Sequence, residues 1–157
     1  MNIFSKGKNR ITLALCSVAI TGMLVAQAAS ADDKMLSGTS CQPNSGAAVS
    51  DFSYYSTGIQ NNSTTTQWVT CSGVRDVYSG AVLSAGVNVA GTGTFSCYFD
   101  NVNNNGTLGG WKYASRTNTG YLTIVPSLFA AIPYTPYAFL CSLPTNSKLV
   151  STYINEL

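Results

Sequence analysis

The sequence contains no histidine, and charged residues supply only 9% of its 157 residues. Without histidine, the chain cannot form a Ser-His-Asp triad, a histidine metal site or a histidine acid–base pair. It also lacks the Gly-x-Ser-x-Gly motif that presents the nucleophile of many serine hydrolases. These absences argue against the familiar hydrolase chemistries, and the chain carries no cofactor or metal motif. We therefore expect a non-catalytic protein that uses no cofactor.

The first 31 residues show the order of regions that is typical of a secretory signal peptide. Lys6, Lys8 and Arg10 precede an apolar stretch over residues 11–26, and small residues follow at the end of the segment. We expect cleavage before Asp32 and export of the remaining domain to the periplasm or the extracellular space. The apolar stretch is short for a membrane span and contains polar residues, so no stable membrane insertion is expected after cleavage.

Removal of this leader would leave residues 32–157, a chain of 126 residues and the size of one ordinary domain. The formal net charge would change from +2 to −1, so the electrostatic basis for binding nucleic acid is lost. Asn, Ser, Thr and Gly supply 54 of these 126 residues, whereas Asp, Glu, Lys and Arg together supply 11. We therefore expect a polar but mostly uncharged surface, with a polysaccharide or an envelope protein as the partner.

Short runs rich in β-branched and aromatic residues alternate with turn clusters along the domain, and helical periodicity is almost absent. Asn, Gly, Ser, Thr and Pro are frequent in the turn clusters, which lie at 43–46, 61–66, 91–93, 101–110 and 144–146. Eight short strands with this spacing predict a single all-β domain, a jelly-roll-like β-sandwich. The expected strands are 51–57, 67–72, 81–90, 94–99, 111–115, 120–125, 137–143 and 148–155.

Four cysteines follow the leader, and an even number in an exported chain predicts two disulfides. These residues are Cys41, Cys71, Cys97 and Cys141. Four cysteines allow three pairings. Period-two alternation places Cys97 and Cys141 each on a strand face that also carries aromatic residues, so both are expected to point into a core. We therefore favour a bond between Cys97 and Cys141, which leaves Cys41 for Cys71.

Aromatic residues give the clearest indication of a binding surface. Trp68 alternates with two small polar residues in its expected strand, so it is predicted on the solvent side. Trp111 and Tyr113 share one strand face and follow two glycines. Exposed aromatic rings can stack on the apolar faces of sugar rings. Trp68, Trp111 and Tyr113 are therefore the candidate binding surface, and the alternative is that most aromatic residues belong to the core.

The favoured function is a non-catalytic structural or binding domain that recognises a carbohydrate or a protein surface. A fimbrial or other assembling subunit is an alternative, although residues 32–38 lack the alternating apolar pattern of a donor strand. A further alternative is a glycoside hydrolase that uses two carboxylates. Its pair would have to come from Asp51, Asp76, Asp100 and Glu156. The simpler interpretation is a local Arg75–Asp76 ion pair, a turn at Asp100 and a Glu156 near a frayed terminus.

Several segments of the domain carry a family resemblance. They are WVTCSGVRD at 68–76, the mid-chain Cys97, YAFLCSLP at 137–144 and STYINE at 151–156. Together they resemble a group of small exported bacterial proteins that have a signal peptide, four cysteines in this order and no assigned activity. The chain departs from the group at Ser72, where proline is expected. The resemblance implies a disulfide-bonded β-sandwich from a bacterium, and it implies no mechanism.

Overall fold

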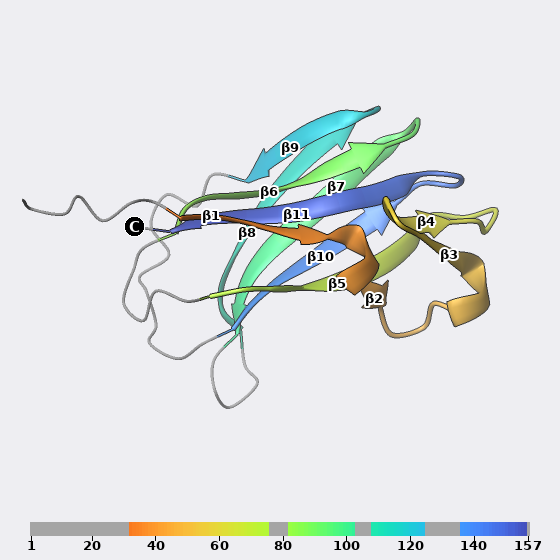
Figure 1. Ribbon diagram of the computed structural model, residues 1–157. Helices are drawn as coiled ribbons and strands as arrows, with labels where there is room; N and C mark the ends of the chain where they lie inside the picture. Colours follow the sequence, from red (N-terminus) through yellow and green to blue (C-terminus); the bar gives the residue numbers. More distant parts are fainter. Residues whose placement is uncertain (1–31, 76–81, 103–107, 125–135, 157) are drawn as a thin grey trace, which may run out of the picture.

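The computed structural model describes residues 32–75, 82–102, 108–124 and 136–156, which form strands almost throughout (Figure 1). Two short 3₁₀ helices, η1 (Gly38–Ser40) and η2 (Val49–Asp51), lie between the first strands. The strands form two antiparallel sheets around one hydrophobic core. The protein is therefore an all-β sandwich, as the sequence predicts.

The two sheets contain six and five strands. The six-stranded sheet contains β1 (Asp32–Ser37), β3 (Phe52–Tyr55), β4 (Gly58–Asn61), β6 (Val82–Ala90), β9 (Gly120–Ile124) and β11 (Lys148–Glu156). The five-stranded sheet contains β2 (Gln42–Pro43), β5 (Gln67–Gly73), β7 (Thr94–Val102), β8 (Leu108–Thr117) and β10 (Tyr137–Leu143).

The order of the strands is that of a jelly roll. The six-stranded sheet runs β3-β4-β11-β6-β9, with β1 also paired to β11, and the five-stranded sheet runs β2-β5-β10-β7-β8. From β4 to β11, the chain changes sheet at every connection except the one between β7 and β8. The alternation places β4-β11-β6-β9 side by side within the six-stranded sheet and β5-β10-β7-β8 within the five-stranded sheet, which is the eight-stranded jelly-roll arrangement.

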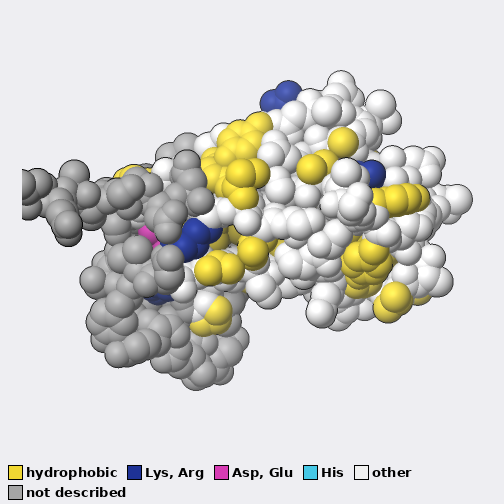
Figure 2. Space-filling view, in the orientation of Figure 1, with side chains coloured by type: hydrophobic (Ala, Val, Ile, Leu, Met, Phe, Trp, Pro, Cys, Tyr) yellow, Lys and Arg dark blue, Asp and Glu magenta, His cyan; other side chains and the backbone are white. Residues whose placement is uncertain are grey.

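The surface is polar and carries few charges, as the composition indicates. On the face shown in Figure 2, hydrophobic side chains form separate patches, and Lys and Arg side chains are scattered. The most exposed large hydrophobic side chains include several aromatic ones: Tyr54, Tyr55, Trp111, Tyr113 and Tyr121. Contiguous groups of exposed apolar side chains often form binding surfaces.

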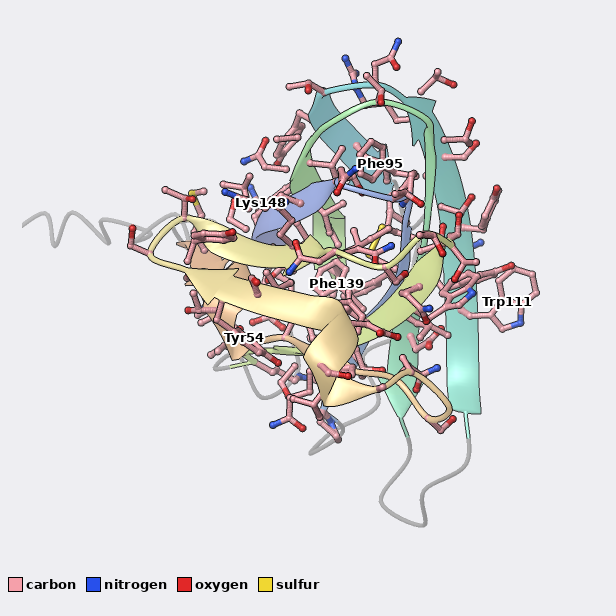
Figure 3. The ribbon with its side chains drawn as sticks, turned by 90° about the vertical axis from the view of Figure 1, so that its right-hand side faces the viewer. Tyr54, Phe95, Trp111, Phe139 and Lys148 are labelled. Atoms are coloured by element: carbon pink, nitrogen blue, oxygen red, sulfur yellow. A yellow bond between two sulfur atoms is a disulfide. The ribbon has the colours of Figure 1, made fainter. Side chains whose placement is uncertain are left out.

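Alternating side chains from both sheets fill the space between them. Phe95, Phe99 and Phe139 of the five-stranded sheet are fully buried, and the ring centroids of Phe99 and Phe139 are 5.0 Å apart. Figure 3 shows Phe95 and Phe139 in the interior of the sandwich. The six-stranded sheet contributes smaller buried side chains to the same cluster, among them Val87 and Ile154.

Both disulfides join neighbouring segments of the five-stranded sheet, and the predicted pairing is confirmed. Cys97 on β7 lies directly opposite Cys141 on β10, and their Cα atoms are 4.1 Å apart. Cys41, the residue before β2, is bonded to Cys71 on β5 at the same Cα separation of 4.1 Å. All four cysteines are buried. Alternation within the two strands therefore predicted correctly that Cys97 and Cys141 point into the core.

The expected strands did not include the short strands β1, β2 and β4. β1 and β2 pair with β11 and β5 through their backbones, and such pairing does not require an alternating apolar sequence. The single strand expected over 51–57 ends at Tyr55, because the chain turns before Gly58, whose φ is 127°. A Cβ atom at position 58 would collide with the backbone of Leu149, so the close approach of β4 to β11 requires glycine here.

The turn expected over 61–66 begins after Asn61, which is the last residue of β4 and is fully buried. Its Nδ2 donates hydrogen bonds to the carbonyl oxygens of Leu143 and Thr65, both at 2.8 Å. Its Oδ1 accepts hydrogen bonds from the backbone N–H and the hydroxyl of Ser63. The amide is fully paired, which is why a polar side chain can occupy this core position.

Strands β7 and β8 are longer than expected. β7 continues to Val102 and β8 begins at Leu108, so both ends of the turn expected over 101–110 belong to strands. Asn101, expected in an exposed turn, is buried and pairs with Gly110 across the two strands. Continued cross-strand pairing therefore overrides the local turn preference of asparagine. Residues 103–107 of this segment lie outside the described residues.

Loss of the Cys97–Cys141 disulfide should destabilise the domain. In the double variant Cys97→Ala, Cys141→Ala, we expect the free energy of unfolding to fall by about 4 kcal/mol and the melting temperature by roughly 15 °C. The reason is that the bond closes a loop with a sequence separation of 44 residues in the unfolded chain. Circular dichroism melts of the oxidised proteins measure the change. A melting temperature equal to that of the parent protein would contradict this expectation.

Candidate functional site

The outer face of the five-stranded sheet carries the candidate binding surface. Because side chains alternate along a strand, Tyr98 and Asp100 of β7 point away from the core when the buried Cys97 points into it. On the neighbouring strand β8, Tyr113 lies directly opposite Tyr98, and Trp111 lies directly opposite Asp100. The register of these two strands therefore places three aromatic side chains side by side on the solvent-facing side.

Four aromatic rings form one cluster on this face, which we call the aromatic platform: Trp68, Tyr98, Trp111 and Tyr113. Tyr98 lies at its centre, with ring-centroid distances of 6.1 Å to Trp68, 5.7 Å to Trp111 and 5.1 Å to Tyr113. The rings come from β5, β7 and β8. Leu140 of β10, the strand between β5 and β7, is directly opposite Tyr98. The platform therefore spans four adjacent strands.

The rings of the platform differ in exposure. Trp111 is 57% exposed and Tyr113 is 49% exposed, whereas Trp68 and Tyr98 are half-buried. Figure 3 shows Trp111 extending from β8 away from the body of the protein. The structure therefore brings together all three residues that the sequence selects. Sequence reasoning misses Tyr98, although its alternation with Cys97 places it on the same outer face.

Polar groups border the platform. A shallow pocket of about 200 Å³ beside Tyr98 is lined by Tyr98, Asp100, Trp111 and Leu140. Partial burial raises the pKa of the Asp100 carboxyl group. The hydroxyls of Tyr113 and Ser96 lie 3.2 Å apart and share a hydrogen bond. Hydrogen bonds to Ser96 and Ser115 lower the pKa of the Tyr113 hydroxyl. The surface thus combines apolar ring faces with hydroxyl groups and one carboxyl group.

The carboxylates considered for a hydrolase lie in different places. Asp51 is the last residue of η2, and Asp100 lies on the outer face of the five-stranded sheet. Glu156, the last residue of β11, is fully buried between the sheets. The five-stranded sheet therefore separates the Asp100 carboxyl group from that of Glu156. Asp76 lies outside the described residues.

The expectation that Glu156 lies near a frayed terminus is wrong. Its carboxylate is fully buried and lies 3.8 Å from Nζ of Lys34 on β1. It also lies 3.8 Å from Nε of Arg75, which follows β5. Two cations compensate the charge of Glu156, which explains how a carboxylate can occupy the interior. Asp76, the partner expected for Arg75, lies outside the described residues.

The same cluster reaches the five-stranded sheet through Tyr137 of β10. The guanidinium of Arg75 lies over the Tyr137 ring, 5.1 Å from its centroid. The pKa of Tyr137 is raised to about 12, chiefly by burial; Arg75 opposes the rise, and Glu156 contributes to it. The hydroxyl is therefore neutral at physiological pH. Glu156, Arg75 and Tyr137 thus join the two sheets at one end of the sandwich.

Among the described residues, no helix has the length and apolar character needed to cross a membrane. In the same part of the chain, no three His, Cys, Asp or Glu side chains gather where they could hold a metal ion. No protein-family model matches the sequence, and no curated protein matches it. The resemblance to four-cysteine exported bacterial proteins therefore stays a prediction.

Replacement of Glu156 by glutamine should destabilise the fold by about 3 kcal/mol or more, because Lys34 and Arg75 would lose the buried carboxylate that compensates their charges. Urea unfolding at pH 7 measures the loss. Asp51→Asn, at the end of η2, is the control and should change stability by less than about 0.5 kcal/mol. If the two variants lost the same free energy of unfolding, the buried ion pairs of Glu156 would not contribute specifically to stability.

The raised pKa of Asp100 means that the folded protein binds this proton more tightly than the unfolded chain does, so stability falls as pH rises through the folded-state pKa. We expect Asp100→Asn to melt at a higher temperature than the parent protein at pH 7. Near pH 3, below the ordinary pKa of about 3.9, the two should melt together. Melting curves at both pH values test this. If Asp100→Asn were less stable than the parent protein at pH 7, the claim that burial of the Asp100 carboxylate destabilises the fold would be wrong.

Proposed function

We propose that this protein is an exported, non-catalytic domain that binds a polysaccharide through the aromatic platform. The observation that carries the proposal is the contact of Trp68, Trp111 and Tyr113 with the central Tyr98 on the outer face of one sheet. Single exposed aromatic side chains are common and need no functional explanation, whereas contiguous apolar surface is a mark of binding.

The chemistry of a sugar ring complements this surface. The C–H groups of a pyranose form an apolar face that packs on aromatic rings, and its hydroxyls form hydrogen bonds at the edges. Beside the rings, the hydroxyls of Tyr113 and Ser96 and the carboxyl group of Asp100 supply such partners. The pocket next to Trp111 has no Lys or Arg among its described lining residues, which favours a neutral glycan over a polyanion.

The sheet holds the rings of the platform in place before a ligand arrives. Tyr98 and Tyr113 are directly paired in the register of β7 and β8. The Cys97–Cys141 disulfide joins β7 to β10 at the residue next to Tyr98. A rigid surface loses little conformational entropy on binding, so more of the contact energy contributes to affinity. This preorganisation supports a binding function for the platform.

Export to the periplasm or the extracellular space of a bacterium belongs to the same proposal. The leader has the regions of a signal peptide, with basic residues, an apolar stretch and small residues in that order. Disulfides form and persist in oxidising compartments, and the domain contains two. The bacterial source rests on the family resemblance alone.

Assembly by strand donation has less support than glycan binding. In donor-strand assembly, a partner strand completes an open groove in an unfinished sheet. In this protein, β11 pairs with β6 along one side and with β1 and β4 along the other. The last strand is therefore already flanked, and we retain glycan binding as the proposed function.

The proposal predicts that Trp111→Ala weakens binding to a polysaccharide by about tenfold or more, because truncation of an aromatic side chain that anchors a ligand typically costs about 2 kcal/mol. The first measurement is a glycan array and a pull-down on insoluble cell-wall polysaccharides with the oxidised protein. Trp68→Ala should have the same direction of effect. Trp111 is largely exposed, so its loss should leave the circular dichroism spectrum unchanged.

Tyr54→Ala is the matched control, because Tyr54 is 47% exposed and lies on β3 of the other sheet. It should bind as the parent protein does. Equal binding by the Trp111→Ala, Trp68→Ala and parent proteins would exclude the platform as the site. Failure of the parent protein to bind any glycan would refute the proposed function and favour a structural role.

A further inference from the structure

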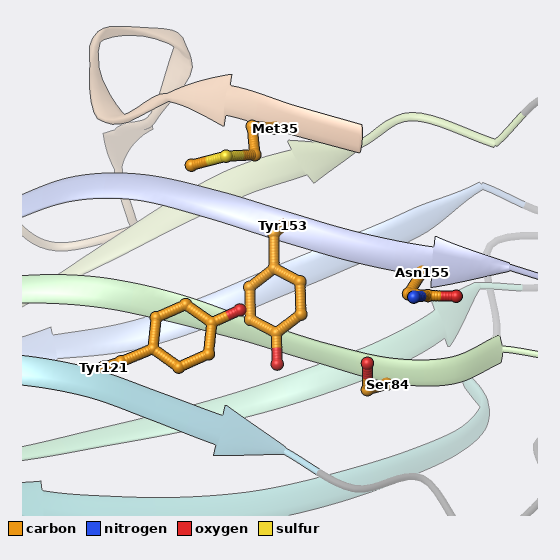
Figure 4. Close-up of a pocket in the computed structure, with 5 residues that line it drawn as sticks. All are labelled: Met35, Ser84, Tyr121, Tyr153 and Asn155. Carbon is orange, nitrogen blue, oxygen red and sulfur yellow. The ribbon is translucent and has the colours of Figure 1, made fainter. Parts of the chain in front are cut away.

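The six-stranded sheet carries a second aromatic group on its own outer face. Tyr153 of β11 lies directly opposite Gly86 of β6. A Cβ atom at position 86 would collide with the Tyr153 ring, so glycine allows this ring to lie over β6. The ring then reaches Tyr121 of β9, and the two rings stack with centroids 4.5 Å apart and planes inclined by 25°. Figure 4 shows the stacked pair with its neighbours.

A pocket of about 330 Å³ adjoins this stacked pair. It is lined by Met35, Ser84, Tyr121, Tyr153 and Asn155, and none of these side chains is charged (Figure 4). Ser84 and Asn155 are directly opposite each other on β6 and β11. The pocket therefore has an aromatic wall, a thioether from β1 and a polar side formed by a hydroxyl and an amide.

The amide of Asn155 has an unused acceptor. Its Oδ1 atom is buried and has no hydrogen-bond partner among the described residues. Leaving a buried polar atom unpaired costs about 1–3 kcal/mol. The amide lines the pocket and can offer its nitrogen, or after a half-turn its oxygen, to a hydroxyl group in the pocket. A ligand hydroxyl in the pocket can therefore form a hydrogen bond with this amide.

We infer that this pocket is a second glycan site, which holds one neutral sugar ring against the Tyr121–Tyr153 pair. The ligand class rests on the proposed function, but the site does not share a residue with the platform. Small-molecule sites typically have volumes of about 300–1,000 Å³, so the pocket suits one ring rather than an extended chain. Uncharged lining residues favour a neutral sugar. Since the two sites lie on opposite sheets, one molecule would hold two glycan segments.

The two sites can be tested separately in one titration. Trp68 and Trp111 are the two tryptophans of the chain and both belong to the platform, so tryptophan fluorescence reports on that surface. Backbone amide NMR shifts of β9 and β11 report on the pocket. The probes are cellohexaose, chitohexaose and maltohexaose, each added to the oxidised ¹⁵N-labelled protein. For at least one probe, we expect both a fluorescence change and shifts in β9 and β11.

Tyr121→Ala should lower the affinity measured from the NMR shifts of β9 and β11 at least tenfold. The affinity measured by tryptophan fluorescence should stay unchanged. Tyr121 is 42% exposed, and Tyr54→Ala at 47% exposure is the matched control that should alter neither response. Ser84→Leu is a second variant, which places a larger side chain in the pocket and retains both tyrosines. Its NMR spectrum should be that of a folded protein. Binding measured from β9 and β11 should again be weakened, and binding measured by fluorescence should not.

Each outcome distinguishes the two proposals. A fluorescence response without shifts in β9 and β11, or pocket variants that bind as the parent does, would overturn the second site and leave the platform intact. Shifts in β9 and β11 without a fluorescence response would support the pocket and refute the platform. The absence of both responses to all three probes would overturn the second site as a neutral-glycan site and count against the proposed function.

Discussion

The antiparallel register of β10 between β5 and β7 is the constraint on which the rest of the structure depends. In this register, Cys141 faces Cys97 inside the sandwich, and Leu140 lies opposite Tyr98 outside it. A shift of one residue would exchange the two faces of the strand. The Cys97–Cys141 disulfide locks the pairing. The same register therefore builds the core and assembles the aromatic platform on its outer side.

The buried charge cluster lies apart from the two proposed binding surfaces. Glu156 and its two cations lie at one end of the sandwich, where they help to join the sheets. The two outer faces present aromatic rings together with hydroxyl and amide groups, and the carboxyl group of Asp100 borders the platform. The proposed neutral, hydroxyl-rich ligand matches such surfaces because they offer both stacking and hydrogen bonds.

Seven of the eight expected strands correspond to β5 through β11, because each contains a clear run of alternating or β-branched residues. The short strands β1, β2 and β4 escape prediction because their backbones pair with strands that other parts of the chain have formed. The sequence-based predictions for Asn61 and Glu156 are wrong for a related reason. Each is a polar residue that can be buried only because distant residues, such as Leu143 and Lys34, provide its partners.

The sequence by itself determined the all-β class, the inward faces of Cys97 and Cys141, the outward position of Trp68 and the shared face of Trp111 and Tyr113. These properties depend on period-two alternation, which neighbouring residues define. Only the tertiary structure decided that Tyr98 joins those three residues, and that Gly86 lets Tyr153 stack on Tyr121. Contacts between strands depend on sheet order and register, and these follow from the packing of the whole chain rather than from any local pattern.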